Sequence, residues 1–298
     1  MRTAFIEELC ELAATDKKVF LLCGDLGFSV LEVFADRFPD RFMNVGISEQ
    51  NMIQVASGLA LEGYNVFVYS IGNFPTLRCM EQIRYDVCYH NLNVTIVAVG
   101  AGYAYGPLGV SHHTTEDIAM MRSIPNMLVA APGDPWEAKL ITRYFVQNPG
   151  PGYMRVNKAG ELAVHSTCGL GAIEPGSLLP IKEGVGTAVV STGAILDLIV
   201  SQLDAKGLRY GVFSCPFISR LDSDGLMGVL KRYNQVITVE EHQLSGGFGS
   251  FFLEEINRLH VAGLIDEFPL VRRVGIPDIF QGFAGTQDFL REKAGIRI

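Results

Sequence analysis

The segment GISEQNM, residues 46–52, places a single carboxyl group, Glu49, directly before an apolar helical pattern. Ser48 can cap that helix, and an acid in the first turn is favoured by the positive end of the helix dipole. Glu49 therefore has a purely structural explanation, and its spacing alone favours that explanation over a chemical role.

A second candidate is the segment SHHTTED, residues 111–117. Here Thr114 or Thr115 can cap a helix whose first turn holds the following acids, with His112 and His113 in the preceding loop. Two adjacent histidines do not easily face one ion, and the spacing suggests no third ligand. We therefore predict no metal site on this chain.

Two glycine-rich segments lack the spacing of a nucleotide-binding loop. GAGYAYGPLG (100–109) follows a strand without opening a clear helix, and no GxxxxGK[ST] occurs. Its glycines either let a loop pass close to a ligand or make tight turns. HQLSGGFG (242–249) offers backbone N–H groups to an anion, or is a turn that tightens a strand against a helix.

The elements that must position these residues alternate along the chain. Short apolar runs are separated by amphipathic stretches, which is typical of parallel sheets covered on both faces. Around 157–185 the sequence becomes rich in Gly and Pro, and alternation resumes after it. We predict an α/β chain of two doubly wound domains, a mostly parallel-sheet domain followed by a smaller one, with bounds 1–165, a linker 166–185, and 186–298.

Composition narrows the class of protein. The chain has 298 residues, 48% of them hydrophobic, and a mean hydropathy of +0.24, enough to bury more than one core. Its apolar runs are well short of the about 18 residues that span a bilayer, and the N-terminus lacks a signal-peptide core, so we expect a cytoplasmic protein that binds no membrane. A net charge of -8 argues against nucleic-acid binding, although it allows a local basic pocket for a small anion. The six cysteines form no CxxC pair, which favours buried thiols over disulfides or zinc ligands.

Several segments in order along the chain resemble the pyrimidine-binding half of thiamine-diphosphate enzymes of the transketolase family. They are LLCGDLG, FMNVGISEQNMIQVASGLALEGYNVFVYS, GNFPTLRCMEQIRYDV, VSHHTTEDIAMMRSIPNMLVAAPGDPWEA and PGYMRVNK. Similar segments occur in deoxyxylulose-phosphate synthase and in β subunits of 2-oxoacid dehydrogenases. TAVVSTG and VEEHQLSGGFGS are similar to that family's C-terminal domain, so the resemblance covers nearly the whole chain.

The resemblance assigns roles around the cofactor. Glu49 matches the acid that hydrogen-bonds the pyrimidine ring, where a protonated carboxyl favours the imino tautomer that activates the cofactor. Such an acid must be desolvated, which fits the start of an apolar helix. Phe74 matches the aromatic that stacks on the pyrimidine, and Asp25 an acid near the cofactor pocket, with a core Phe and a turn acid as their alternatives. His112, rather than His113, matches a His that faces substrate and aminopyrimidine.

The resemblance also implies a site for a sugar phosphate. Arg155, Arg2 and Ser29 match phosphate contacts, and an Arg fork suits phosphate oxygens, although Arg2 is also explained as a solvated charge. Two positions depart from the family pattern: Gly100 replaces a His and Leu108 replaces an Asp, both of which contact substrate in the family. These departures place the usual pentose phosphates in doubt.

A whole functional part is missing from this sequence. The family binds the diphosphate and its Mg²⁺ with a GDG segment and a later Asn, and no GDG occurs here; SDG at 223–225 is the nearest match. The resemblance therefore implies that thiamine diphosphate and Mg²⁺ are held mainly by an N-terminal, diphosphate-binding partner subunit in an α2β2 assembly. Exposed apolar surface on this chain would then be interface.

The function implied is that of the C-terminal subunit of a split transketolase, which transfers a two-carbon ketol unit from a ketose phosphate to an aldose and is active only with its partner. The alternative is a β subunit of a pyruvate or acetoin dehydrogenase, which SHHTTEDIAMMRSIPNM and Arg155 disfavour. A regulatory subunit without turnover is the third possibility, disfavoured by the matches at Glu49, Phe74 and His112.

Overall fold

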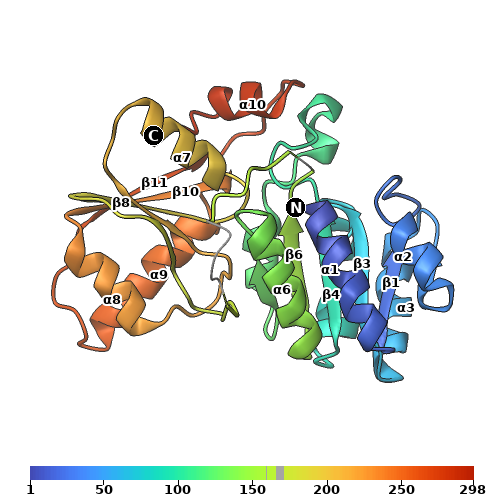
Figure 1. Cartoon of the computed structure of the whole chain (residues 1–298). Helices are drawn as coiled ribbons and strands as arrows, with labels where there is room; N and C mark the ends of the chain where they lie inside the picture. Colours follow the sequence, from blue (N-terminus) through green and yellow to red (C-terminus); the bar gives the residue numbers. More distant parts are fainter. Residues whose placement is uncertain (159, 166–170) are drawn as a thin grey trace.

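Two β-sheets, each flanked by helices, lie side by side in the computed structural model (Figure 1). The structure describes residues 1–158, 160–165 and 171–298. Within these residues, no helix combines the length and the apolar character that crossing a membrane requires.

The first sheet has six strands, all parallel, in the order β2-β1-β3-β4-β6-β5. The strands are β1 (Val19–Cys23), β2 (Phe42–Asn44), β3 (Asn65–Ile71), β4 (Val94–Val99), β5 (Leu128–Ala130) and β6 (Gly152–Val156). Strands β1, β4 and β6 are buried along their whole length, which explains why their sequences are continuous apolar runs. The mostly parallel first sheet predicted from the sequence is confirmed.

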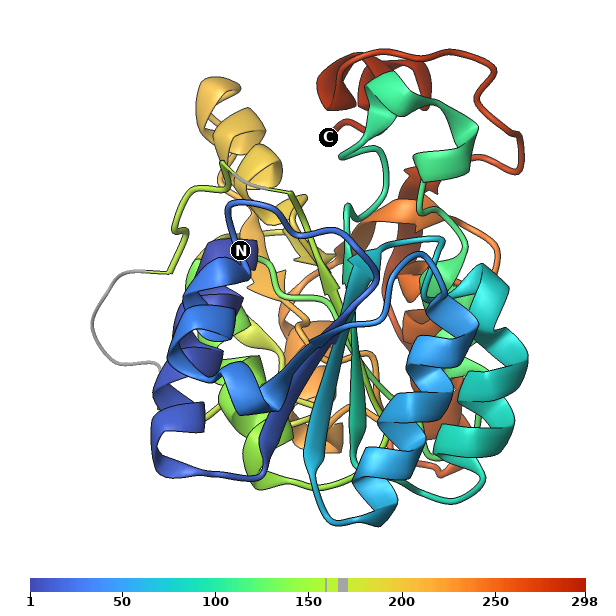
Figure 2. The ribbon, with the colours of Figure 1, turned by 90° about the vertical axis from the view of Figure 1, so that its right-hand side faces the viewer.

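Helices cover both faces of this sheet (Figure 2). One face carries α1 (Arg2–Thr15) and α6 (Pro135–Gln147), whose apolar side chains share one core cluster. The other carries α3 (Glu49–Leu61) and the helical segment 77–88, which share another cluster. The short helices α2 (Glu32–Arg37) and α5 (Asp117–Arg122) complete this unit.

The second sheet has five strands in the order β11-β10-β8-β9-β7. The strands are β7 (Leu179–Lys182), β8 (Thr187–Ser191), β9 (Gly211–Ser214), β10 (Gln235–Gln243) and β11 (Leu270–Ile276). Only β7 runs antiparallel to its neighbour. The helices are α7 (Leu196–Ala205), α8 (Ser223–Arg232), α9 (Phe248–Val261) and α10 (Gln287–Lys293). The smaller second α/β unit is thus as predicted.

Some elements differ from the sequence prediction. The helix expected over 77–90 is a 3₁₀ turn (Leu77–Cys79), one turn of α4 (Met80–Gln82) and a π-helical turn (Ile83–Cys88). The edge strand β7 lies within the predicted linker 166–185, because its alternation is short and interrupted by Pro180. Strand β11 was not predicted, since its exposed arginines hide the strand pattern. The domain bounds themselves remain a prediction.

The helix expected to be capped by Thr114 or Thr115 begins later, at Asp117. Thr114 instead pairs with Gly102 in an isolated antiparallel bridge, which holds the loop 100–109 against the segment that carries the two histidines. The cap residue is Glu116, which forms no side-chain cap hydrogen bond.

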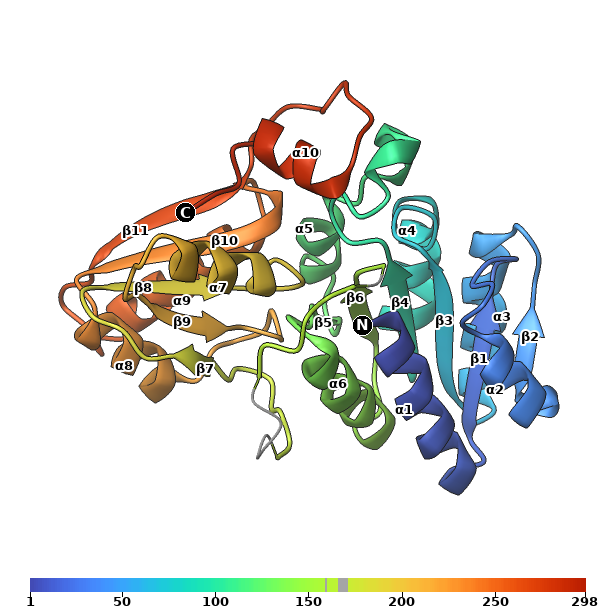
Figure 3. The same ribbon diagram turned by 45° about the horizontal axis from the view of Figure 1, so that its top comes forward.

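The end of the chain reaches back to the first unit. Figure 3 shows α10 above the loop that follows β4, and Gly285 N–H donates to the carbonyl of Gly106 at 3.3 Å. Glu241 at the end of β10 accepts from the backbone N–H of Tyr103 at 2.7 Å and pairs with Arg291 of α10 at 2.6 Å. The loop after β4 is therefore fixed by both units.

The cysteines agree with the prediction of buried thiols as far as they are described. Five are free and buried: Cys10, Cys23, Cys79, Cys88 and Cys215. Cys168 lies outside the described residues.

Candidate functional site

The loops that follow β1, β3 and β4 meet at the carboxyl edge of the first sheet, where open α/β sheets bind ligands. Asp25 lies just after β1, Phe74 after β3 and Gly100 after β4. Glu49, at the start of α3, lies at the same edge, since the place of a Cβ on Gly24 is 3.7 Å from its Oε1.

Glu49 is buried, with a side chain only 4% exposed. The expected desolvation of this acid is present, but the expected cap is not: Ser48 forms no side-chain cap hydrogen bond. Glu49 Oε2 instead accepts a hydrogen bond from Arg78 Nη1 at 3.1 Å. Helix capping by Ser48 therefore does not account for an acid at this position.

Phe74 lies beside this carboxyl, and Arg78 joins the two. The guanidinium of Arg78 stands over the Phe74 ring, 4.2 Å from its centroid, while it bonds Glu49. Sequence reasoning missed Arg78; its place in the first turn after Phe74 was the available signal. A carboxyl and an aromatic face thus meet around one flat, hydrogen-bonding group.

The two adjacent histidines have different surroundings. His112 is half-buried; its ring lies edge-on to Phe74 with centroids 5.3 Å apart, and its Nδ1 is 2.9 Å from the Ser111 hydroxyl. Burial lowers the pKa of His112, and the positive charges of His113 and Arg78 lower it further. His113 is buried against Tyr103 instead, with its Nε2 3.5 Å from the Gly106 carbonyl. The structure thus brings His112, and not His113, to Phe74.

Asp25 and Ser29 lie in the exposed loop after β1, both with a positive φ, of 56° and 63°. Asp25 and Asn44 exchange two hydrogen bonds of 3.0 Å, and the Ser29 N–H donates to Glu32 at 2.8 Å. These residues shape a loop at the rim of the site, and their side chains face solvent in the described chain.

Arg2 is not the solvated charge that the sequence allowed. It is half-buried, its guanidinium lies beside the hydroxyls of Tyr69 and Tyr105, and its Nε is buried without a hydrogen-bond partner among the described residues. Its predicted contact with a phosphate remains a prediction, and its place at the same sheet edge is consistent with one.

Arg155 is a correction, because its geometry does not favour the predicted phosphate contact. Its side chain is 3% exposed, and its Nε donates to Asp117 Oδ2 at 2.7 Å. Its Nη2 donates to the carbonyls of Thr114 and Glu241, at 2.7 and 3.0 Å. The fork that suits a phosphate is already used to join β6, the histidine segment and β10.

The glycine-rich turn before α9 also binds an internal group. The N–H groups of Phe248 and Gly249 donate to the carboxyl of Glu240 at 2.6 and 2.8 Å. Burial raises the pKa of Glu240 to about 7, against the lowering effect of these two hydrogen bonds. The acceptor that this turn meets is therefore a side chain of the same chain.

One trio within the described ranges has the side chains to hold a metal ion: Asp134, Glu137 and His165. Their atoms are already hydrogen-bonded. Asp134 accepts from the backbone N–H of Glu137 and His165 at 2.9 and 3.0 Å, and Glu137 lies 2.7 Å from His165 Nε2. This trio joins the segment after β6 to the start of α6.

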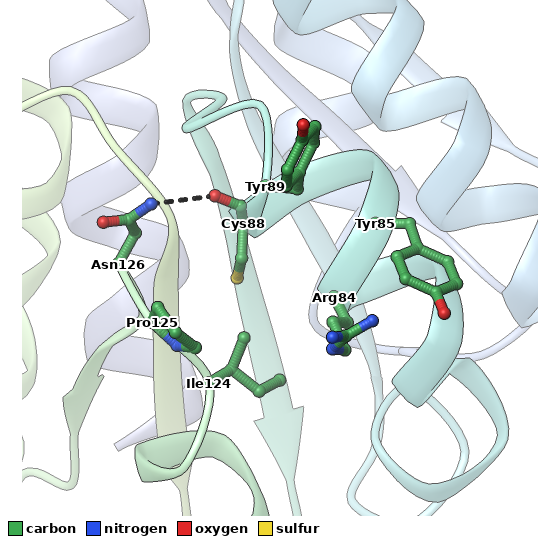
Figure 4. Close-up of a pocket in the computed structure, with 7 residues that line it drawn as sticks. All are labelled: Arg84, Tyr85, Cys88, Tyr89, Ile124, Pro125 and Asn126. Carbon is green, nitrogen blue, oxygen red and sulfur yellow. Dashed lines mark hydrogen bonds between the residues drawn. The ribbon is translucent and has the colours of Figure 1, made fainter.

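Two hollows lie on the surface near these elements. One, of about 530 Å³, is lined by Phe74, Arg78, Ser111, His113 and Glu116 together with Phe280 from the second unit. The other, of about 410 Å³, is lined mostly by apolar and aromatic side chains beside the π-helical turn (Figure 4). Burial raises the pKa of the Cys88 thiol in this second hollow to about 12, and none of the predicted site residues lines it. The chemistry therefore concentrates beside the first hollow.

Comparison with known proteins agrees with this geometry. Residues 1–160 match the family model described as the transketolase pyrimidine binding domain, and residues 176–296 match the transketolase C-terminal domain. The chain belongs to the transketolase family. This transketolase chain is 34% identical to one subunit of the apulose-4-phosphate transketolase of Actinobacillus succinogenes, over 88% of the chain and 83% of the relative.

Two further similarities concern split transketolases. The chain is 34% identical to a putative transketolase C-terminal section of Methanocaldococcus jannaschii, over 99% of the chain and 92% of the relative. A solved structure of a split gene transketolase, described as an inactive beta4 tetramer, is 33% identical and superposes with a TM-score of 0.85, covering 99% of this chain and 93% of that one. The predicted resemblance to the C-terminal subunit of a split transketolase is thus confirmed.

Proposed function

We propose that this chain is the pyrimidine-binding subunit of a two-subunit transketolase that depends on thiamine diphosphate and transfers a two-carbon ketol unit from a ketose phosphate to an aldose. The observation that carries the proposal is the buried carboxyl of Glu49 beside the ring of Phe74 and, through it, His112. That arrangement lies in a chain that belongs to the transketolase family.

The described residues fit the pyrimidine half of the cofactor. A pyrimidine offers a ring face for Phe74 and a ring nitrogen for the carboxyl of Glu49. The Arg78 guanidinium takes both contacts here, and because its side chain is 49% exposed it can move aside into solvent. Arg78 thus marks the place of a flat group with a hydrogen-bond donor.

When bound, thiamine diphosphate supplies a nucleophilic carbon and an electron sink for breaking the carbon–carbon bond next to a ketone. Glu49 would hold a proton at the pyrimidine nitrogen, in a position that burial keeps from bulk water. His112, neutral because of its lowered pKa, would accept or return a proton at a substrate hydroxyl. Phe74 would fix the plane of the ring between them.

The rest of the cofactor requires a partner subunit, in our proposal an α2β2 complex. The metal-competent trio within the described ranges is already bonded internally, so Mg²⁺ and the diphosphate would be held by a second chain. Exposed apolar side chains surround the site, as a covered surface requires. They are Phe28, Ile47, Leu77, Leu108 and Val110.

The experiment is reconstitution with a diphosphate-binding transketolase subunit, starting with the product of any adjacent reading frame that carries GDG and a later Asn. We expect turnover of a ketose phosphate with an aldose only when both subunits and thiamine diphosphate are present. Turnover confined to a 2-oxoacid with a lipoyl acceptor would replace this function by that of a dehydrogenase β subunit. No cofactor binding with any such partner would favour a regulatory subunit.

The residue assignment is tested by Glu49→Gln in the reconstituted enzyme. Because Gln cannot hold the exchangeable proton, we expect the rate to fall by about 10²- to 10⁴-fold. The control is Glu62→Gln, since Glu62 ends the same helix in solvent. A Glu49→Gln enzyme as active as this control would contradict the assignment.

A further inference from the structure

The side-chain space at Gly100 is filled from within the chain. Gly100 directly follows β4 and has a φ of +95°, and a Cβ placed on it would lie 2.2 Å from a ring carbon of Tyr105. The Tyr105 ring therefore stands where a side chain at position 100 would begin. A substitution at Gly100 would have to expel that ring.

Tyr105 continues the row of rings that leads away from Glu49. The Phe74 and His112 rings have centroids 5.3 Å apart, and the His112 and Tyr105 rings 6.3 Å apart. Tyr105 is half-buried rather than enclosed. It thus stands one ring farther from the proposed cofactor position than His112 does, in the direction that a substrate chain would extend.

Positive charge flanks this ring on two sides. Lys158, exposed just after β6, has its Nζ 5.4 Å from the centre of the Tyr105 ring. Arg2 lies beside the Tyr105 hydroxyl and keeps its buried Nε without a hydrogen-bond partner among the described residues. A hydroxyl between two cations offers an anion a donor as well as charge.

We propose that Tyr105 is the residue that selects the substrate of this enzyme. Its ring closes the end of the substrate path and so favours a sugar phosphate with a shorter carbon chain. Its hydroxyl, together with Arg2 and Lys158, receives the phosphate of that sugar. This inference rests on the proposed function, because the path is defined by the cofactor position at Glu49 and Phe74.

The test compares Tyr105→Ala and Tyr105→Phe in the reconstituted enzyme with two ketose phosphates that differ by one carbon in length. Removing the ring should shift the ratio of their kcat/KM values toward the longer substrate by about 10-fold or more, as expected when a pocket gains room. Tyr105→Phe should keep the ratio and raise KM for both substrates. An unchanged ratio in Tyr105→Ala would overturn the inference.

Two controls keep the result interpretable. Tyr89→Ala removes a tyrosine that is 80% exposed beside the other hollow, and it should change neither the ratio nor KM. Tyr105→Leu should show a smaller shift of the ratio than Tyr105→Ala, and it replaces the alanine variant if that chain does not fold. Melting temperatures of all variants establish folding.

A binding measurement separates this inference from the proposed function. Calorimetry of the complex with the same two sugar phosphates reports their relative affinity without turnover. If no ketose phosphate is turned over, the proposed function fails, whereas a changed affinity ratio in Tyr105→Ala still supports the role of Tyr105. Equal affinity ratios in the wild-type and Tyr105→Ala complexes would overturn that role whatever the activity.

Discussion

Glu49 and Arg155 are both charged residues in apolar surroundings, yet the structure gives them opposite positions. Glu49 is paired with a side chain that is half-exposed and can leave, so its carboxyl can meet a ligand. Arg155 is paired with Asp117, whose side chain is 1% exposed, and with two carbonyls. The sequence shows the charge of each residue, whereas its availability depends on partners that are distant along the chain.

The structural position of Arg155 leads to a prediction about stability. Arg155→Met leaves the buried carboxyl of Asp117 without its cation, so the free energy of unfolding of the isolated chain should fall by about 3 to 5 kcal/mol. A residue that only binds substrate phosphate would show no such loss. Urea unfolding of the two chains measures the difference.

The matched control for that substitution is Arg143→Met. Arg143 of α6 pairs with Glu8 of α1, but its side chain is 51% exposed, so the expected loss is below about 1 kcal/mol. Similar losses for the two variants would show that burial of Arg155 is not what matters.

At the scale of elements, the strong patterns were predictable and the weak ones were not. Continuous apolar strands such as β4 and long amphipathic helices such as α9 follow from local sequence. The π-helical turn after α4 and the edge strand β7 depend on packing that no short window contains. The same holds for the site: Glu49 and Phe74 could be found by motif, while Arg78 and Tyr105 required the fold to bring them there.

The clasp between the segment after β6 and helix α6 should make stability depend on pH. Burial lowers the pKa of His165, but the hydrogen bond and charge of Glu137 outweigh it, so the pKa lies above its usual 6.5. A raised folded-state pKa means that the protonated pair stabilises fully below about pH 6.5 and that this contribution disappears as pH rises through the folded-state value.

The corresponding variant is His165→Gln, which should cost about 1 to 3 kcal/mol at pH 5.5 and clearly less at pH 8.5. Denaturant unfolding at several pH values measures this difference. His90→Gln, at an exposed position, is the control and should change little at either pH. A loss at His165 that is the same at both pH values would contradict a protonated pair.

At the scale of the whole molecule, the chain presents one half of a site with apolar side chains around it. The carboxyl and the aromatic ring come from the first unit, and Phe280 from the second unit lines the same hollow. Large apolar side chains rim this edge although a chain that acted alone would be expected to bury them. The similar protein described as an inactive beta4 tetramer fits the view that copies of such a chain assemble without completing the site.

A charge placed on this surface should therefore weaken assembly without weakening the fold. Phe28 is 74% exposed in the loop after β1, so Phe28→Asp should leave the melting temperature of the isolated chain nearly unchanged. Binding to the diphosphate-binding partner, measured by calorimetry, should fall by at least about 10-fold, because a desolvated aromatic contact is replaced by a buried charge. Val261→Asp, at a residue 76% exposed at the end of α9 in the second unit, is the matched control and should bind the partner normally. If both variants bind equally well, the partner covers another face, and the cofactor would have to be completed from a direction that leaves Glu49 at the edge of the interface.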